Sequence, residues 1–227
     1  MSSPIRNSPH QQLALDLIQP QRPSFDNFVV GRNAEVIAAL RRLAAGGAER
    51  FVYLWGGEGS GRSHLLQAIA ASDSSCWLDS TNGSVAFDPA VRLYLADDVD
   101  RFDPVRQQQL FVLQNEIRAS RNCALVASGS AAPAQLVLRE DVRTRLAWGL
   151  VYQIHGLSDV EKEDALRAHA ASRGFDLSAE VLGYLLTHMP RDLSTQVAIL
   201  DALDAYALEA KRAITVPLVR EWAQGRD

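Results

Sequence analysis

Short apolar runs alternate with helical patterns through the first two thirds of the chain. The runs carry few polar residues, which is typical of strands buried on both faces of a parallel sheet. They span residues 51–55, 75–79, 91–98, 122–128 and 150–154. Helical patterns fall between them, at residues 34–45, 61–72, 104–121 and 141–147. Strands that alternate with helices predict an α/β fold with a five-stranded parallel sheet covered on both faces.

The helix at residues 34–45 has recognisable ends. Asn33 stands at its N-cap position, where a side-chain oxygen accepts a hydrogen bond from the first turn. Gly46 and Gly47 are expected to end it. The helix expected at 104–121 carries the apolar residues Leu110, Val112, Leu113 and Ile117.

Only helical patterns follow residue 158. Residues 158–161, SDVE, fit a capping box, in which the serine and the glutamate each satisfy a backbone N–H at the helix start. Helices are expected near residues 159–173, 178–188, 192–211 and 217–224. The first 24 residues are rich in Pro, Ser and Gln and predict a flexible extension. We therefore divide the chain into a tail, 1–24, an α/β domain, 25–156, and a small all-α domain, 157–227.

A glycine-rich loop joins the first strand to the next helix. Residues 56–63, GGEGSGRS, fit the phosphate-loop pattern G-x-x-x-x-G-K-[ST] at every fixed position but one. Glycines such as Gly56, Gly59 and Gly61 let backbone N–H groups turn toward phosphate oxygens, and the next helix points its N-terminal donors at the same anion. The alternative is a glycine-rich turn that binds no ligand. The order of strand, loop, hydroxyl and helix favours phosphate binding.

Arginine stands at the lysine position of this pattern. Arg62 keeps the positive charge as a planar fork rather than a compact ammonium, so the exchange is not conservative. The lysine of the pattern contacts the β and γ phosphates. We therefore expect phosphate binding without brisk independent hydrolysis. Ser63 would supply a hydroxyl to Mg²⁺.

Two aspartates end the strand at residues 91–98. Beside a phosphate loop, Asp97 is placed to hold Mg²⁺ through water, and Asp98 is placed as the acid that polarises the attacking water. An isolated pair of this kind is more often a helix cap or a turn, but the phosphate loop favours the catalytic interpretation. Ser128 and Ser130, at the end of a later strand, are two candidates for sensing the γ-phosphate.

Charge and composition narrow the class of protein. The formal net charge is −4, and the sequence contains no run of Lys or Arg that would attract a polyanion. Cys76 and Cys123 lie in apolar runs, which favours buried thiols over a disulfide. The N-terminus has no basic-then-apolar leader, and no apolar run approaches membrane-spanning length. We expect a cytoplasmic protein without membrane contact.

One apolar island interrupts the polar tail. Residues 12–17, QLALDL, place leucines at alternate positions, which is extended rather than helical. In a flexible tail such an island is a candidate docking peptide for a partner's pockets. The alternative is a strand that packs on its own domain, and the spacing favours neither.

The order of these features resembles that of the AAA+ ATPases, and two segments narrow the resemblance to the replication initiator DnaA and its relatives. Residues 25–31, FDNFVVG, are similar to the segment that lies against the adenine in that family. Residues 145–150, RLAWGL, resemble the R-[LF]-x-W-G-L box, whose first arginine is offered to a neighbour's nucleotide. The resemblance covers nearly the whole chain after Ser24.

The chain departs from full-length initiators at both ends. No DNA-binding module is expected after the helical lid, and a short tail replaces the long N-terminal domain. Residues 12–17 are similar to the Q-L-x-L-x-[LF] peptide by which bacterial proteins dock on the sliding clamp, the β subunit of DNA polymerase III. This combination resembles the Hda group, DnaA homologues that inactivate the initiator. Members of that group share the arginine found here at Arg62.

The resemblance implies roles for matching residues. Arg145 would be the finger acting in trans, Asp98 would take the catalytic acid position with a shorter side chain than the usual Glu, and Arg191 would be the second sensor arginine. For Arg145 the alternative is a salt bridge to Asp141 on an i,i+4 spacing, and for Arg191 it is a surface charge. The nucleotide would be held by Phe28, Val29, Gly56, Gly59, Gly61, Arg62, Ser63, His64 and Arg191. Mg²⁺ would be held by Ser63 and, through water, Asp97. The clamp would be bound by Gln12, Leu13, Leu15 and Leu17.

The resemblance therefore implies a negative regulator of replication initiation. It would bind ADP or ATP with Mg²⁺, dock on the clamp loaded on DNA, and stimulate hydrolysis of ATP bound to DnaA. Self-association is a further expectation. One alternative is an adaptor or accessory initiator homologue that recruits DnaA or other partners without promoting hydrolysis. Another is an independent ATPase motor, which the Arg62 exchange disfavours.

Overall fold

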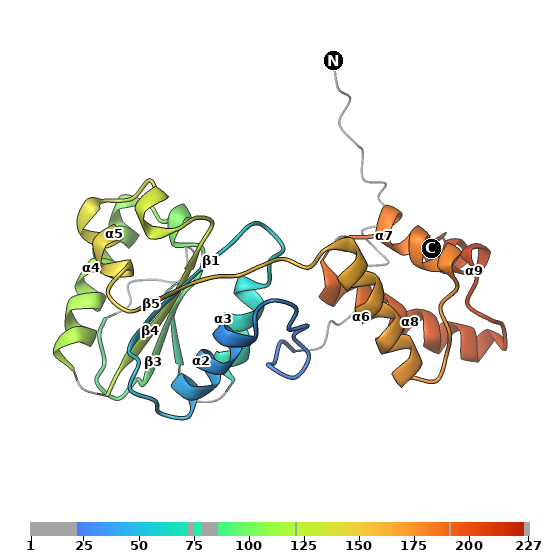
Figure 1. Ribbon diagram of the computed structural model, residues 1–227, viewed down its shortest axis with the longest axis horizontal. Helices are drawn as coiled ribbons and strands as arrows, with labels where there is room; N and C mark the ends of the chain where they lie inside the picture. The colour runs from blue at the N-terminus through green and yellow to red at the C-terminus, as the bar shows by residue number, and fades with distance from the viewer. Residues whose placement is uncertain (1–21, 72–74, 79–85, 121, 191, 225–227) are drawn as a thin grey trace, which may run out of the picture. The chain divides into compact units, whose positions relative to one another are not determined.

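The computed structural model describes residues 22–71, 75–78, 86–120, 122–190 and 192–224 (Figure 1). It divides the chain into two compact units between Leu157 and Ser158. The first unit is α/β and the second is wholly helical. None of the helices in these residues is both long and apolar enough to cross a membrane.

The α/β unit is built on five parallel strands, as the apolar runs predicted. The strands lie in the order β2-β3-β4-β1-β5. The strands are β1 (Phe51–Trp55), β2 (Ser75–Leu78), β3 (Leu93–Ala96), β4 (Ala124–Gly129) and β5 (Leu150–Gln153). In the register of the sheet, Trp55 pairs with Gly129 on one side of β1 and with Gln153 on the other. The carboxyl ends of β1, β4 and β5 therefore lie side by side at the same end of the sheet.

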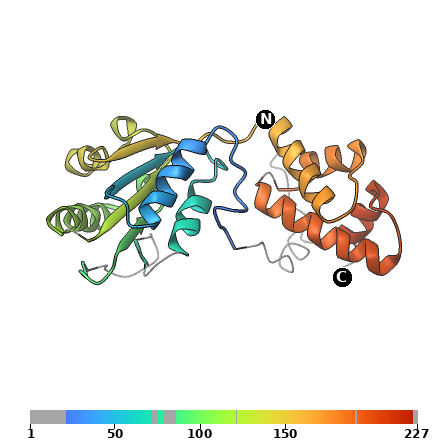
Figure 2. The same ribbon diagram turned by 60° about the horizontal axis from the view of Figure 1, so that its bottom comes forward.

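Helices cover both faces of this sheet (Figures 1 and 2). Val52 and Leu54 of β1 pack into the cluster that contains α2 (Ala34–Ala44) and α3 (Arg62–Ala70). Tyr53, between them, packs into the cluster that contains α4 (Pro104–Ala119) and α5 (Glu140–Leu146). Because successive side chains of a strand point to opposite faces, one apolar run supplies both cores. Two 3₁₀ turns, η1 (Val99–Arg101) and η2 (Pro133–Gln135), complete the unit.

The helical unit contains α6 (Asp159–Ser172), α7 (Ala179–His188), α8 (Leu193–Ala210) and α9 (Val216–Gln224). The capping box predicted at its start is confirmed: the Glu161 N–H donates to Ser158 Oγ, and the Ser158 N–H donates to Glu161 Oε2. Fully or almost fully buried side chains from the four helices form one core. They include Leu166, Leu182, Leu185, Leu200, Leu203 and Trp222.

The predicted N-cap position of α2 is confirmed at Asn33, but the expected capping bond is absent. The Asn33 side chain instead contacts the backbone of His155. A long-range partner therefore outcompeted the local cap. In helix α4, 47% of Val112 is exposed, whereas Gln114 is fully buried.

Candidate functional site

The phosphate loop connects the central strand β1 to helix α3 and is closely packed. A Cβ on Gly56 would lie 2.5 Å from the carbonyl oxygen of Ile154, so only glycine fits there. Gly61, just before α3, has φ +98°, and a Cβ on it would lie 2.7 Å from the ring of Phe28. Side chains are strained at that φ. The glycines predicted from the motif therefore meet real steric and backbone requirements at these two positions.

The loop offers unsatisfied donors to an anion. Ser60 is buried, with 6% of its surface exposed, and its hydroxyl has no hydrogen-bond partner among the described residues. Helix α3 begins at Arg62 and carries no acidic residue in its first turn. No acidic side chain of this turn therefore balances the positive end of the helix dipole or accepts from the first N–H groups of the helix. A buried hydroxyl left unpaired is costly, so these residues fit a bound phosphate.

Arg62 forms an ion pair with the acid predicted to polarise water. Arg62 Nη2 lies 3.1 Å from Asp98 Oδ1, and only 11% of the Arg62 side chain is exposed. Its Nη1 is buried with no partner among the described residues. Arg101 Nη1 lies 3.4 Å from the other oxygen, Asp98 Oδ2. Neither pair was predicted, although the i,i+3 spacing of Asp98 and Arg101 was visible in the sequence.

The predicted acidic residues Asp97 and Asp98 both bond to Ser128, whereas Ser130 bonds to Asp100. The Ser128 hydroxyl donates to Asp97 Oδ1, and the Asp98 N–H donates to Ser128 Oγ at 3.0 Å. Ser130 instead donates to Asp100, through its N–H at 3.0 Å and its hydroxyl at 2.8 Å. Ser128, fully buried beside Asp97, is therefore the serine that shares a network with the predicted metal-linked acid.

A buried tyrosine underlies this edge of the sheet. Tyr53, in β1, donates its hydroxyl to the carbonyl oxygen of Ala131 at 2.8 Å. Burial, and then the negative charge of Asp100, raise the pKa of Tyr53 well above its ordinary value of 10. The phenol consequently stays neutral at physiological pH and acts as a fixed donor.

The predicted metal ligands are few but compatible with magnesium. Among the described residues, no group of three or more His, Cys, Asp or Glu side chains gathers to hold a metal ion. Magnesium usually keeps several waters and uses one or two carboxylates together with substrate phosphates. Ser63, in the first turn of α3, and Asp97, after β3, would supply such a partial set.

The segment predicted to lie against adenine packs on the phosphate loop and its helix. Phe28 meets the His64 ring edge-on, with 5.3 Å between ring centroids. His64 Nε2 lies 2.9 Å from the carbonyl oxygen of Ser24. Val29 is half-buried beside Phe28 in the sequence. The structure thus brings Phe28 and His64 together with Gly61.

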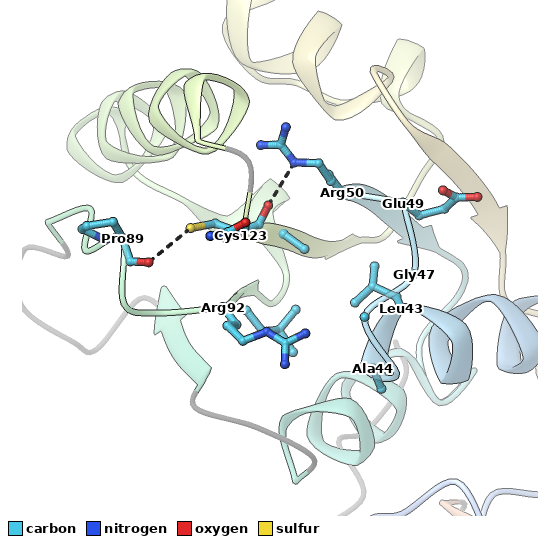
Figure 3. Close-up of a pocket in the computed structure, with 12 residues that line it drawn as sticks. Leu43, Ala44, Gly47, Glu49, Arg50, Pro89, Arg92 and Cys123 are labelled. Atoms are coloured by element: carbon cyan, nitrogen blue, oxygen red, sulfur yellow. Dashed lines mark hydrogen bonds between the residues drawn. The ribbon is translucent and has the colours of Figure 1, made fainter.

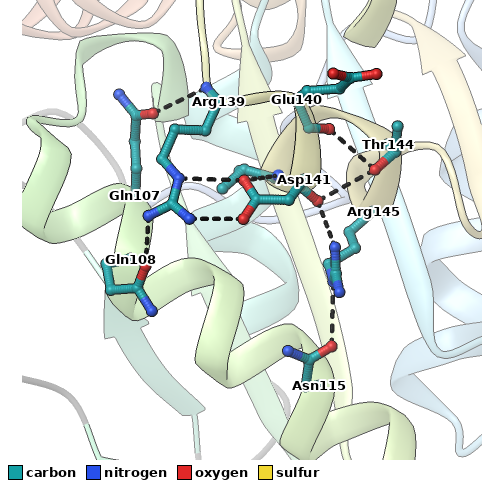
Figure 4. Close-up of polar contacts among 9 residues, drawn as sticks. Gln107, Gln108, Asn115, Arg139, Glu140, Asp141, Thr144 and Arg145 are labelled. Atoms are coloured by element: carbon teal, nitrogen blue, oxygen red, sulfur yellow. Dashed lines mark hydrogen bonds and ion pairs between the residues drawn. The ribbon is translucent and has the colours of Figure 1, made fainter.

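Arg145 is held by its own unit at the end of α5 (Figure 4). Its Nε donates to Asn115 Oδ1 at 3.1 Å, and its Nη1 donates to the backbone oxygen of Asp141 at 2.8 Å. The guanidinium also lies 4.1 Å from the Phe111 ring centroid. The alternative salt bridge from Arg145 to the Asp141 carboxylate is wrong.

That carboxylate pairs with Arg139 instead, at 2.6 Å (Figure 4). The two bonds to Arg145 engage two of the five N–H groups of its guanidinium. Sequence reasoning missed Asn115, which lies 30 positions away.

A pocket lies at the amino-terminal ends of the strands, opposite the end that carries the phosphate loop (Figure 3). It has a volume of about 390 Å³ and is lined by the residues that precede β1, β3 and β4, Arg50, Arg92 and Cys123 among them. Arg50 Nε donates to the carbonyl oxygen of Cys123 at 3.2 Å. Ligands of open α/β sheets bind outside the carboxyl ends of the strands. This pocket lies at the amino ends, so it is separate from the phosphate loop.

Some predicted residues lie outside the described residues. They are Gln12, Leu13, Leu15 and Leu17 of the candidate docking peptide and Arg191 of the helical unit.

Two family models match the chain. Residues 159–222 match the model described as "Hda, lid domain", and residues 20–79 match that of the bacterial DnaA ATPase domain.

Solved structures share the fold. Domain III of the replication initiation protein DnaA from Thermotoga maritima superposes with a TM-score of 0.70 at 20% identity, over 89% of this chain and 95% of that one. AMPPCP-bound DnaA from Aquifex aeolicus gives 0.66 at 17% identity, over 86% of this chain and 68% of that one. The RuvB Holliday-junction branch-migration motor from Thermotoga maritima gives 0.59 at 14% identity, over 90% and 74%.

At these identities the structural likeness shows the fold alone. It confirms the predicted AAA+ module with a five-stranded parallel sheet and an all-α lid. With the two family matches added, the chain is similar to the DnaA ATPase domain over residues 20–79 and to the Hda lid domain over residues 159–222, which supports a DnaA-homologous, Hda-like protein.

Proposed function

We propose that the chain binds an adenine nucleotide in its phosphate loop and acts on ATP held by DnaA. The observation that carries the first part is the closely packed loop with a buried, unpaired Ser60 hydroxyl at the N-terminus of α3. AMPPCP is bound by DnaA structures of the same fold. ADP or ATP is therefore the ligand class that this site supports best.

Individual residues have separate roles in this proposal. Backbone donors of Gly59 and Gly61 would face the phosphates, while Gly56 donates its N–H to the carbonyl oxygen of Gly129 and shapes the loop. Arg62 would supply positive charge, and Phe28 with Val29 and His64 would border the base. Arg191 of the helical unit is proposed as a further cation toward the nucleotide. Ser63 and Asp97 would hold Mg²⁺, which neutralises phosphate charge when bound.

The action on DnaA depends on Arg145. An arginine supplied in trans stabilises the charge that develops on a transferred phosphoryl group, and in GTPase precedents it adds about 10³–10⁵ in rate. Support comes from the fixed position of the Arg145 guanidinium, with three of its N–H groups not used by the bonds to Asn115 and Asp141. A finger that is already positioned loses little entropy when it meets its target.

Docking on the sliding clamp is the remaining part of the proposal. It rests on the sequence of residues 12–17, QLALDL. Tethering to a clamp on DNA would raise the local concentration of the protein near DnaA, so that weak contact suffices. Gln12→Ala with Leu13→Ala is expected to abolish clamp binding, and unchanged affinity would refute the docking role.

The deciding experiment measures hydrolysis of ATP bound to DnaA, with clamp loaded on DNA, in the presence and absence of this protein. Arg145→Ala should reduce the stimulated rate by roughly the factor of a finger, 10³ or more. Arg143→Ala, two positions earlier in the same helix, is the matched control and should retain stimulation. Equal rates with Arg145→Ala and the natural chain would exclude the finger.

A second candidate is an adaptor that recruits DnaA without promoting hydrolysis. It is favoured by the contacts of Arg145 with Phe111, Asn115 and Trp148, which give this side chain a structural role within its own unit. The same assay separates the two functions, because an adaptor binds DnaA and leaves its hydrolysis rate unchanged.

A further inference from the structure

Both oxygens of the Asp98 carboxylate face arginine side chains. Arg62 Nη2 lies 3.1 Å from Oδ1, and Arg101 Nη1 lies 3.4 Å from Oδ2. The Arg62 side chain is 11% exposed and the Arg101 side chain 72% exposed. Because solvent weakens exposed ion pairs, Arg62 is the stronger of the two restraints.

The backbone of Asp98 is fixed as well. Its φ of +46° lies in the left-handed region, which few residues other than glycine adopt. Its N–H donates to Ser128 Oγ at 3.0 Å and to Asp97 Oδ1 at 3.1 Å. Ser128 is fully buried in β4, so this anchor does not move with the surface. Asp98 is thus held both at its backbone and at its carboxylate oxygens.

Hydrolysis of a bound ATP would require an oxygen of this carboxylate to face water. The water oxygen bonds to the γ-phosphorus while the bond from that phosphorus to the β–γ bridging oxygen breaks, which yields ADP, inorganic phosphate and a proton. A carboxylate that orients the water and accepts this proton must present a lone pair to it. The Arg62 guanidinium competes for that lone pair.

We propose that Arg62 is a positioning residue that holds Asp98 away from the attacking water, so that the site keeps its nucleotide instead of consuming it. The proposal rests on the proposed nucleotide binding and adds how this chain's own hydrolysis is suppressed. It gives the arginine at the lysine position of the loop a second task besides its charge. A planar fork spans from the loop to Asp98, whereas lysine is a compact point charge on a flexible stem.

Arg62→Lys tests this directly. The lysine is expected to contact the phosphates and release Asp98, and so to raise the single-turnover rate of ATP hydrolysis by the purified full chain at least about tenfold, since a positioned general base contributes roughly 10²–10⁴-fold. A gain of activity cannot arise from damage to the fold. Arg101→Lys should give a smaller gain, because that arginine is exposed. Arg41→Lys is the matched control, because it alters an exposed ion pair with Asp26 that does not involve Asp98. It should give no gain in the hydrolysis rate.

Two further measurements make the outcome decisive. Asp98→Asn added to Arg62→Lys should remove the gain, and equilibrium binding of a fluorescent ADP analogue is measured for every variant. A gain that survives Asp98→Asn, or no gain while Arg62→Lys still binds nucleotide, overturns the proposal. Loss of binding in Arg62→Lys alone also overturns it, because Arg62 would then be a phosphate ligand that lysine cannot replace. Failure of the natural chain itself to bind would instead refute the proposed nucleotide site, and this inference with it.

Discussion

The side chain of Asn33 joins the start of helix α2 to the end of strand β5. Its Nδ2 donates to the carbonyl oxygen of His155 and its Oδ1 accepts from the His155 N–H, both at 2.9 Å. Asn33 is 3% exposed, so water does not compete for these bonds. The paired residues also fix the chain beside Ile154, whose carbonyl oxygen borders Gly56 of the phosphate loop. One amide therefore links the sheet edge to the wall of the candidate site.

Asn33→Ala should destabilise the α/β unit and weaken nucleotide binding. The change leaves one N–H and one C=O of the half-buried His155 without their partners, at a cost of about 2–4 kcal/mol. Urea unfolding measures the loss, and binding of a fluorescent ADP analogue measures the effect on the loop. Asn27→Ala, which removes an exposed asparagine bonded to Ser24 and Arg22, is the control and should stay within about 0.5 kcal/mol. Equal losses in the two variants would show that the link to His155 contributes nothing specific.

Gly61→Ala should be costly even without nucleotide. The residue has φ +98°, and the added methyl group would lie 2.7 Å from the Phe28 ring. Strain of this kind costs roughly 1–3 kcal/mol. Gly57→Ala supplies the comparison within the same loop, because nothing lies within 4 Å of its Cβ position and its φ is not positive. Thermal unfolding of the nucleotide-free variants should separate them, and a stable Gly61→Ala chain would contradict the packing of Phe28 on the loop.

The features that could be predicted from the sequence are those that depend on a few consecutive residues. The five apolar runs, the phosphate-loop spacing and the capping box at Ser158 each lie within a few residues, and all three appear where they were expected. The ion pair between Arg62 and Asp98 could not be read from the sequence, because it joins two loops through the sheet and leaves no periodic pattern. Asn33 shows the same limit, since its local capping preference lost to a partner 122 positions away.

Gln114→Leu should stabilise the α/β unit. Gln114 is fully buried in helix α4, and both polar atoms of its side chain lack partners among the described residues. An unpaired buried amide costs about 1–3 kcal/mol, and a leucine of similar size removes that cost. We expect the melting temperature to rise by several degrees, in line with about 1 kcal/mol for a domain of this size. Gln109→Leu on the same helix should give no gain, since that amide accepts a bond from Arg106. A lower melting temperature for Gln114→Leu would mean that the amide is satisfied in solution.

Asp192 should make the stability of the helical unit depend on acid. Its carboxylate caps α8, accepting from the Thr195 N–H and the Ser194 hydroxyl, both at 2.8 Å. Burial alone would raise the pKa of Asp192, but the hydrogen bonds from Thr195 and Ser194 outweigh it and hold the pKa below its ordinary value of 3.8. A lowered folded-state pKa contributes stability that is present above the unfolded value and is lost as the pH falls through the lowered one.

Asp192→Ala should therefore cost about 1 kcal/mol at pH 7, the usual value of an N-cap. The difference from the natural chain should begin to shrink near pH 3.8, where the unfolded-state carboxyl group becomes protonated, and should shrink further as the pH falls through the lowered pKa of the folded state. Urea unfolding at several pH values, followed by far-ultraviolet circular dichroism, measures both effects. Asp192→Asn keeps a capping oxygen without the charge and should retain most of the stability while losing this pH dependence. Asp176→Ala, at an exposed position in the same unit, is the control. A pH-independent difference between Asp192→Ala and the natural chain would exclude the charged cap as its cause.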